Sequence, residues 1–317
     1  MNSDPTNPDS QDSLGTWQVH QSERGREMAS SEFEAVKMLY AVMPELVAEP
    51  LGFGEYKEEE GVSFFVCRYH ELSDDIPDVS DFPALLAEMH RRPAGLSPNG
   101  QFGLNLTTYG GRNPHSFPPA DTWEQCFSGG LNLTFRMEEE THGSDPELDE
   151  LREGIMTKVI PRLLRPLETE GRTIPSVLVH GDIWDGNASV DVNTGQPVIF
   201  DPTPLYAHNE YEMAPWWAPR HKMTSAYVAE YIKHYKVSDP VKDFEDRGAL
   251  YGLWVKPPCL RMSGTKLITI YRRFDLHASS LYLGNLRFRK MYRYLHPITD
   301  SHSSDAVLTL LIVPWPP

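Results

Sequence analysis

Polar residues in the segment 177–212 have the types and the spacing that phosphoryl transfer requires. An apolar run that starts at Val177 leads into His180 and Asp182, Asn187 follows Asp182 by five residues, and Asp201 follows Asn187 by fourteen. A converging amide oxygen and carboxylate would suit Mg2+, a hard cation that takes a few protein oxygens and completes its shell with phosphate and water. Asp182 would then remain to orient an attacking hydroxyl.

A β-hairpin is predicted to bring Asn187 and Asp201 together. The runs 188–192 and 196–200 have strand character, and residues 193–195 form a good three-residue turn. In that register Asn187 lies directly opposite Asp201, with Cβ atoms about 5 Å apart. The spacing therefore predicts a magnesium site on this hairpin, with a surface hairpin carrying incidental acidic residues as the alternative.

Apolar periodicity and turn residues predict the elements around this hairpin. The expected elements are a disordered tail at 1–14, a helix from Ser31 to Met43, a turn at Pro50, Gly52 and Gly54, a strand at 63–67, a helix at 82–90, a loop with short strands at 93–119, and a helix opened by the capping-box pair Ser144 and Glu147 with a kink at Pro161. The helical stripes are interpreted as core packing.

Composition excludes several classes of function. The chain has 317 residues, 40% of them hydrophobic, so it can bury a core, and its formal net charge of -16 argues against nucleic acid or an anionic membrane as a partner. Its three cysteines form no CxxC pair. No secretory signal and no apolar stretch of about 20 residues is visible, so we expect a cytoplasmic protein.

Longer stretches around the candidate site show a resemblance. The relevant strings are HGDIWDGN at 180–187, FDP at 200–202 and YAHNEYE at 206–212, with LLAEMHRRP, FGLNLTTYGG, APRH, DRGALY and RFDLHASS in the same order elsewhere. They resemble the fructosamine (ketosamine) kinase family, in particular its fungal ribulosamine kinase branch. The resemblance runs from near Gly25 to near Arg289, apart from one interruption at 252–272.

The resemblance implies an α+β fold of the protein-kinase-like, aminoglycoside phosphotransferase type. Residues 15–71 would form a partial β-rich N-lobe and hinge, residues 72–317 would form a mostly helical C-lobe, and ATP would enter between them. The implied activity is ATP-dependent phosphorylation of the 3-hydroxyl of ketosamines, on small amines or glycated protein lysines, which serves deglycation. We expect a monomer that uses ATP and Mg2+ and binds neither nucleic acid nor membrane.

The same resemblance implies roles for the residues of the motif. Asp182 would be the catalytic base or the residue that orients the hydroxyl, and Asn187 and Asp201 would hold Mg2+ against the nucleotide phosphates. His180 would brace the catalytic loop by hydrogen bonding. The other candidates are Glu32, Arg68 and Tyr69 for the nucleotide, and Trp184, His208 and Glu210 for the substrate, with packing or loop stabilisation as the alternative for these last three.

Two departures from the family pattern bear on activity. Counting back from Gly25, the position of the phosphate-binding Lys falls at about Gln18, and the first lysine of the chain is Lys37. Residues 252–272 and 292–317 match nothing in the family, and we expect an irregular insertion and an atypical tail. A pseudokinase that keeps the ketosamine pocket, a mispredicted first exon, and another small-molecule kinase of the choline or aminoglycoside type remain open alternatives.

Overall fold

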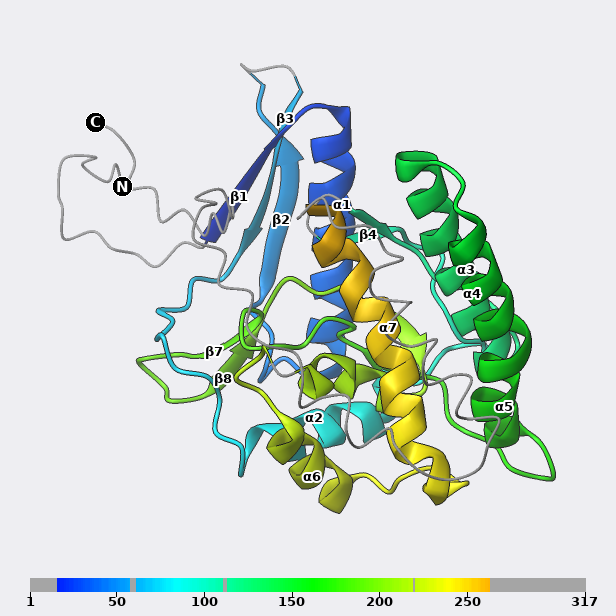
Figure 1. Ribbon diagram of the computed structural model, residues 1–317. Coiled ribbons are helices and arrows are strands. Elements are labelled where there is room, and N and C mark those ends of the chain that lie inside the picture. The colour runs from blue at the N-terminus through cyan, green and yellow to red at the C-terminus, as the bar shows by residue number, and fades with distance from the viewer. Residues whose placement is uncertain (1–15, 58–60, 111–112, 219, 263–317) are drawn as a thin grey trace, which may run out of the picture.

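The computed structural model describes residues 16–57, 61–110, 113–218 and 220–262, which form a small sheet-and-helix unit and a larger helical unit (Figure 1). The small unit contains β1 (Thr16–Gln21), α1 (Glu23–Val42), β2 (Pro50–Glu55) and β3 (Val62–Cys67). Its strands are antiparallel in the order β1-β3-β2, and α1 packs against them. The unit thus supplies the strands and the helix of a small N-lobe.

Helix α1 begins earlier than predicted because Ser22 caps it. The Ser22 hydroxyl accepts a hydrogen bond from the amide of Gly25 at 3.3 Å, which satisfies one of the amides left unpaired at a helix start. Ala29, Val36 and Leu39 then recur at helical spacing and are buried. The helix is therefore held by its cap at one end and by this apolar stripe along its length.

The turn predicted at Pro50, Gly52 and Gly54 is wrong, because all three residues lie in β2. Pro50 is the first residue of the strand, where a missing amide donor is tolerated. The pairing with β3 shifts between Pro50 and Gly52, as in a β-bulge. At Gly54 an added Cβ would lie 2.8 Å from the ring of Phe64, so glycine here permits close approach rather than a turn.

The larger unit follows β3. Its elements in chain order are α2 (Phe82–Arg91), η1 (Pro93–Gly95), β4 (Thr108–Gly110), β5 (Asn113–His115), α3 (Trp123–His142), α4 (Pro146–Gly154), the π-turn η2 (Ile155–Val159), α5 (Ile160–Leu164), η3 (Arg165–Glu168), β6 (Val177–Val179), β7 (Ala188–Val190), β8 (Pro197–Ile199), β9 (Leu205–Ala207), η4 (Asn209–Trp217), α6 (Ser225–His234), η5 (Val241–Asp243) and α7 (Phe244–Met262). Short antiparallel pairs form between β4 and β5, β6 and β9, and β7 and β8. This unit corresponds to a mostly helical C-lobe.

Most predicted elements of the larger unit are confirmed, and one is corrected. Helix α2 matches the helix predicted at 82–90, β4 and β5 are the short strands expected within 93–119, and the π-turn Ile155–Val159 lies just before Pro161, where a kink was expected. The irregular insertion expected at 252–272 is wrong for residues 252–262, which continue α7. Buried Leu250 and Leu253 extend the apolar face of that helix past the expected break.

The ends of the sequence and residues 263–272 lie outside the described residues, and with them the predicted tails 1–14 and 292–317. None of the helices in the described part of the chain has the length and apolar composition that a bilayer span requires.

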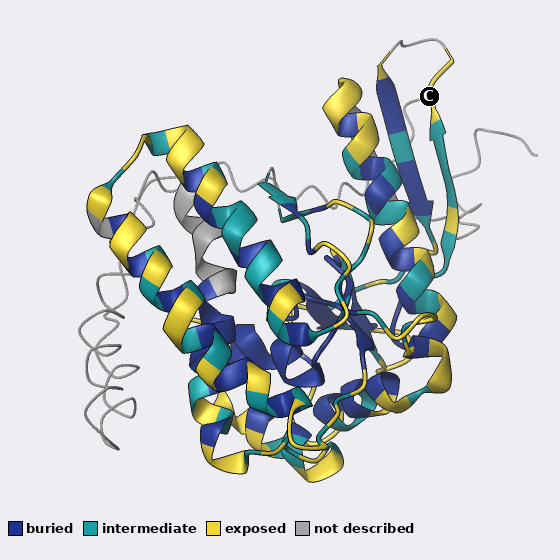
Figure 2. Ribbon diagram, turned by 90° about the vertical axis from the view of Figure 1, so that its right-hand side faces the viewer, coloured by how far each residue is buried: buried dark blue, intermediate teal, exposed yellow. Residues whose placement is uncertain are grey.

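Two buried clusters hold the elements together. One joins α3, α5, α7 and η4 around aromatic residues such as Trp123, Tyr211 and Tyr251. The other joins α1 to α2, β6 and α6, with Leu39, Leu178 and others in contact. The central strands are accordingly buried, whereas the surrounding helices present exposed faces outward (Figure 2). Because the second cluster crosses between the units, α1 is packed on the larger unit and not only on its own sheet.

Candidate active site

The loop that carries the candidate catalytic residues, 180–187, begins where β6 ends, at His180. This side chain is fully buried, its Nε2 lies 2.9 Å from the carbonyl oxygen of Phe200, and its Nδ1 lies 3.3 Å from the amide nitrogen of Asp182. These partners place the proton on Nε2, which donates, while Nδ1 accepts. Burial lowers the pKa of His180 to about 4, so the ring is neutral at pH 7. His180 is thus placed to brace the loop.

Gly181 is required by the shape of the loop. Its φ is +85°, and a Cβ built on it would lie 2.2 Å from the carbonyl oxygen of Thr203. The loop is closed there by the amide of Thr203, which donates to the carbonyl of His180 at 2.9 Å. A side chain at position 181 would therefore meet both an unfavourable φ and a backbone oxygen.

The carboxylate of Glu212 holds the same loop through hydrogen bonds from its backbone amides. It accepts hydrogen bonds from the amides of His180 at 2.6 Å and Gly181 at 2.9 Å, and it lies 3.3 Å from Nε2 of His90. Burial opposes the charge, yet the contacts with His90 and His180 lower the pKa of Glu212 below its usual range. His90 has no motif spacing that would reveal this contact from the sequence.

Asp182 and Asn187 come together at the end of the loop. The Asn187 amide donates to the Asp182 carbonyl at 2.8 Å and to its carboxylate at 3.1 Å. Burial raises the pKa of Asp182 to about 7, and the nearby charge of Asp201 adds to this, while contacts with Asn187, Trp184 and Arg220 oppose it. Asp182 therefore combines a defined orientation with a carboxyl group that can hold a proton near neutral pH.

The hairpin register predicted from the sequence is wrong by one residue. Ala188 pairs with Ile199 and Val190 with Pro197, so Asn187 lies opposite Phe200, whose amide donates to the Asn187 carbonyl at 3.1 Å. Asp201 lies one residue further on, with a φ of +54°. This left-handed conformation interrupts the strand alternation, and the charge of Asp201 still acts on Asp182.

The register differs because the turn holds four residues and not three. Asp191 accepts hydrogen bonds from the amides of Asn193 at 2.9 Å and Thr194 at 2.8 Å, and its own amide donates to the carbonyl of Gln196 at 2.9 Å. Gly195 completes the turn with a φ of +70°. An Asp side chain that binds the turn amides lengthens the loop by one residue, a local interaction that strand propensity does not describe.

The α1–β2 loop and the segment that follows β3 flank the hairpin on its two edges. On the β8 side the amide of Ile199 donates to the carbonyl of Leu46 at 2.8 Å. On the β7 side the amide of Val192 donates to Glu71 at 2.7 Å and that of Ser73 donates to Val190 at 2.9 Å. The α1–β2 loop of the small unit and the segment that links β3 to α2 therefore both pair with the hairpin that carries the candidate site.

The donor set fits a magnesium ion held partly by phosphate. Asp182 and Asp201 are close enough for one charge to disfavour the other, a repulsion that a divalent cation would relieve, and Asn187 supplies an amide oxygen. Among the residues that the structure describes, no group of three or more His, Cys, Asp or Glu side chains could hold a metal. A metal here would thus depend on the amide and on ligand oxygens.

The predicted nucleotide residues lie in the small unit and the hinge. Glu32 is half-buried on α1, on the same face as Ala29 and Val36. Arg68 is exposed and paired with Glu49, and Tyr69 follows it, half-buried, where the chain leaves β3. These positions are on the small-unit side of the hairpin.

The predicted substrate residues divide into two groups. Trp184 is half-buried, and its side chain hydrogen-bonds Asp182. His208 and Glu210 are buried, with His208 bonded to Tyr251 and Ser238 at 2.9 Å each. Glu210 forms a two-bond ion pair with Arg247, at 2.8 and 3.0 Å. For His208 and Glu210 these buried contacts favour loop stabilisation over substrate contact.

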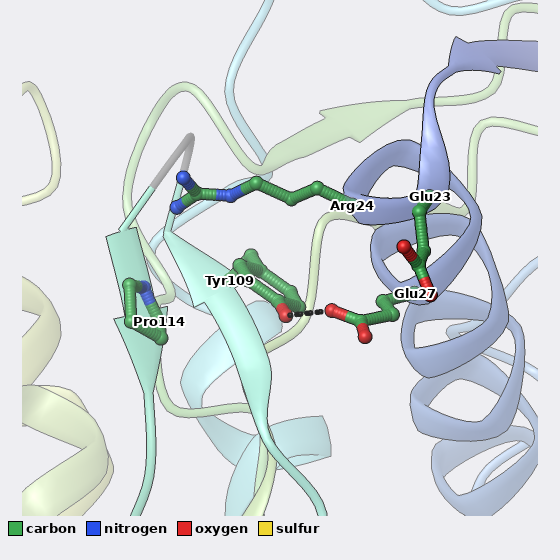
Figure 3. A pocket seen from close by; sticks show the side chains of 5 residues that line it. All are labelled: Glu23, Arg24, Glu27, Tyr109 and Pro114. Atoms are coloured by element: carbon green, nitrogen blue, oxygen red, sulfur yellow. Dashed lines mark hydrogen bonds between the residues drawn. The ribbon is translucent and has the colours of Figure 1, made fainter.

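An open pocket of about 390 Å³ lies between the start of α1 and the β4–β5 hairpin (Figure 3). It is lined by Glu23, Arg24, Glu27, Tyr109 and Pro114, and the Tyr109 hydroxyl donates to Glu27 at 3.4 Å. None of the predicted site residues lines it.

Comparison with known proteins identifies the family. A family model described as fructosamine kinase matches residues 16–267. A chloroplastic protein-ribulosamine 3-kinase of Oryza sativa subsp. japonica is 28% identical over 232 residues, which are 73% of this chain and 62% of that protein, so the chain spans less than two thirds of its length. The ketosamine-3-kinase of Mus musculus is 36% identical over 115 residues, 36% of this chain and 34% of that protein.

Solved structures agree on the fold. A structure from Haemophilus somnus described as a fructosamine-3-kinase gives a TM-score of 0.63 at 15% identity, over 83% of this chain and 82% of that one. An aminoglycoside phosphotransferase gives a TM-score of 0.50 at 13% identity, over 83% of this chain and 86% of that one. The protein-kinase-like fold predicted from the sequence is confirmed, and the chain belongs to the fructosamine kinase family.

Proposed function

We propose that this chain transfers the γ-phosphate of ATP to the 3-hydroxyl of ketosamines. The observation that carries the proposal is the gathering of Asp182, Asn187 and Asp201 at one end of the β7–β8 hairpin. A carboxylate that can accept a proton beside an amide and a second carboxylate is the side-chain set of kinase phosphoryl transfer. Family membership and the names of the relatives support ketosamines as the alcohol substrates.

The proposed reaction assigns a step to each group. Asp182 orients the sugar hydroxyl and takes its proton as the oxygen bonds to the γ-phosphorus. The bond from that phosphorus to the β–γ bridging oxygen breaks, and ADP leaves with the electron pair. Asn187 and Asp201 would hold Mg2+, which would neutralise charge on the phosphates. His180, Gly181 and Glu212 keep the loop in place, so that Asp182 needs no rearrangement.

We further propose where the nucleotide and the sugar bind and which substrates are used. ATP would enter between the small and large units, with Glu32, Arg68 and Tyr69 on the nucleotide side and Trp184 beside the sugar. The substrates would be free ketosamines or glycated lysines of proteins, and the protein would act as a cytoplasmic monomer. The product, a ketosamine 3-phosphate, is still attached to the amine when it forms, and its later breakdown would complete deglycation.

The test is turnover of purified protein with Mg-ATP and either fructosyl-lysine or ribulosyl-lysine, followed by ³¹P NMR for a sugar phosphate monoester and by release of ADP. Asp182→Asn keeps the shape and removes the base, so its rate should fall by at least about 10²-fold. Absence of product from the wild-type chain, under conditions in which a known ketosamine kinase turns over, would contradict the proposal.

A ketosamine-binding protein with impaired nucleotide binding is the second candidate. It is favoured by Gln18, which lies on β1 opposite Phe65, at the position where the family pattern places a lysine. A neutral amide supplies hydrogen bonds to a phosphate but no positive charge. Calorimetric titration separates the two candidates, because a kinase must bind Mg-ATP at physiological concentration, whereas the impaired protein would bind only the ketosamine.

A further inference from the structure

The segment that links β3 to α2 runs along one edge of the β7–β8 hairpin and is bound to it by side chains as well as by backbone (Figure 1). Leu72 forms an antiparallel bridge with Asp191. The hydroxyl of Ser189, a buried residue of β7, donates to the carbonyl of Ser73 at 2.6 Å. Residues 70–73 are therefore fixed to the hairpin over their whole length.

The carboxylate of Asp191 has two separate sets of partners. Its Oδ1 accepts the amides of Asn193 and Thr194, the contacts that shape the turn of the hairpin. Its Oδ2 lies 2.7 Å from Nδ1 of His70. Because an ionised carboxylate only accepts hydrogen bonds, Nδ1 carries the proton and donates it. The side chain of Asp191 is 7% exposed and that of His70 27%, so a largely buried carboxylate joins the turn to the segment.

The two members of this contact belong to different parts of the candidate site. His70 directly follows Tyr69, one of the residues proposed to lie beside the nucleotide. Asp191 lies between Asn187 and Asp201 in sequence, in the turn that decides which residue stands opposite Asn187. The hydrogen bond therefore connects the nucleotide side of the site with the hairpin that carries the proposed metal ligands.

A nucleotide bound in the proposed way would touch both parts at once. Residues 68–69 would lie beside it, and Asn187 and Asp201 would reach its phosphates through the metal. We propose that His70 and Asp191 are a positioning pair, whose hydrogen bond keeps the metal ligands aligned with the nucleotide side of the site. The inference rests on the proposed kinase activity, and the pair acts through Asn187 and Asp201 without touching the reacting atoms.

The contact requires an N–H donor at the place of Nδ1. Asparagine at position 70 can present its side-chain NH2 group there, because that nitrogen is as many bonds from the backbone as Nδ1 of histidine. Leucine fills similar space without a donor. His70→Asn should therefore keep most of the positioning and His70→Leu should lose it, while the turn amides stay bound to Asp191 in both variants.

The experiment measures ADP binding by calorimetry, once with Mg2+ and once with EDTA, and takes the ratio of the two affinities. In His70→Leu this ratio should fall about tenfold, as for a lost residue that orients metal ligands, while ADP affinity in EDTA stays that of wild type. His70→Asn should stay within about threefold of the wild-type ratio. The matched control is His234→Leu, because this exposed imidazole also lies against a carboxylate, that of Glu230 at 3.2 Å, and its loss should leave the ratio unchanged.

A double-mutant cycle separates the pair from a general loss of stability. Asp191→Ala removes the acceptor, so His70→Leu should lower the ratio no further in that background. If Asp191→Ala does not fold, the contrast between His70→Asn and His70→Leu decides alone. An unchanged ratio in His70→Leu, equal weakening of ADP with and without Mg2+, or equal losses in His70→Asn and His70→Leu would each overturn the positioning role.

Turnover distinguishes this inference from the proposed function. In an active kinase, His70→Leu should raise the Mg2+ concentration that gives half the maximal rate by about tenfold and leave the KM of the ketosamine unchanged. An unchanged Mg2+ requirement would overturn the pair and leave the kinase. A Mg2+-dependent ADP affinity that responds to His70→Leu, in a chain that phosphorylates no ketosamine, would contradict the kinase and leave the pair. A wild-type chain whose ADP affinity does not depend on Mg2+ would overturn both.

Discussion

Two backbone amides of the loop 180–187, those of His180 and Gly181, donate to the carboxylate of Glu212, which also contacts His90. Side chains alone therefore do not define the site. The position of Asp182 depends on a buried acceptor thirty residues further along the chain, itself held by a histidine on α2 whose other ring nitrogen lies 2.7 Å from the hydroxyl of Tyr231.

Replacement of Glu212 by glutamine should loosen this loop. The amide keeps one acceptor oxygen but presents an NH2 group to a backbone N–H, so one buried donor is left unpaired at a cost of about 1–3 kcal/mol. Urea unfolding should report that loss, and turnover should fall further than the stability alone explains. Glu139→Gln, at an exposed position of α3, is the control; equal midpoints for the two variants would contradict the clamp.

The ion pair between Arg247 and Glu210 offers a second test at the residue scale, since both side chains are at most 2% exposed. Arg247→Met leaves an uncompensated buried carboxylate and should destabilise the protein by about 3–5 kcal/mol. Arg165→Met removes an exposed partner of Glu124 and should cost at most about 1 kcal/mol. Thermal unfolding of both variants measures the difference, and similar losses would contradict the structural role of the pair.

At the level of elements, the β7–β8 hairpin shows which parts of the site the sequence could predict. The strands and the proximity of Asp182, Asn187 and Asp201 follow from spacing and residue type. The register does not, because it depends on Asp191 binding the turn amides and on the left-handed φ of Asp201. Both are local hydrogen-bond and backbone effects that a two-residue alternation cannot express.

Glycine positions provide an element-scale prediction. Gly181→Ala should destabilise the loop by more than about 1 kcal/mol, since alanine is strained at positive φ and its Cβ would meet the carbonyl of Thr203. Gly154→Ala, in open space on α4, should instead raise stability by about 0.5–1 kcal/mol. Chemical unfolding of both proteins tests the contrast, and it fails if the two substitutions shift the midpoint in the same direction.

For the whole molecule, the family resemblance predicts two lobes. It does not predict how the two lobes pack against each other. The buried cluster that runs from α1 into α2, β6 and α6 joins residues that are distant in sequence, so no local sequence pattern predicts it. The irregular insertion predicted at 252–272 is wrong for residues 252–262 for a related reason. Leu253 of this segment is buried in the cluster that includes residues of η4, and α7 and η4 are in contact.

Buried histidines should make the whole fold sensitive to acid. Burial lowers the pKa of His115 to about 3 and those of His180 and His208 to about 4, against about 6.5 in an unfolded chain. Below pH 6.5 the unfolded chain therefore binds more protons at these histidines than the folded protein does. Their contribution to the free energy of unfolding is fully present above that pH and is lost as the pH falls towards 4. Urea midpoints across this range should decline, and His115→Gln should flatten the slope; an unchanged slope would contradict the assignment.

The β7–β8 hairpin pairs with the α1–β2 loop on one edge and with the segment between β3 and α2 on the other, which couples it to movement of the small unit. A rotation of the small sheet would be carried by residues 46–47 to Ile199 on one edge and by residues 71–73 to residues 190–192 on the other. These contacts lie in or beside the two strands that Asn187 precedes and Asp201 follows. In the proposed reaction, closing around a nucleotide and aligning Asn187 with Asp201 would then be a single motion. Opening to release ADP would disturb the same two residues, so product escape and loss of their alignment would share one barrier.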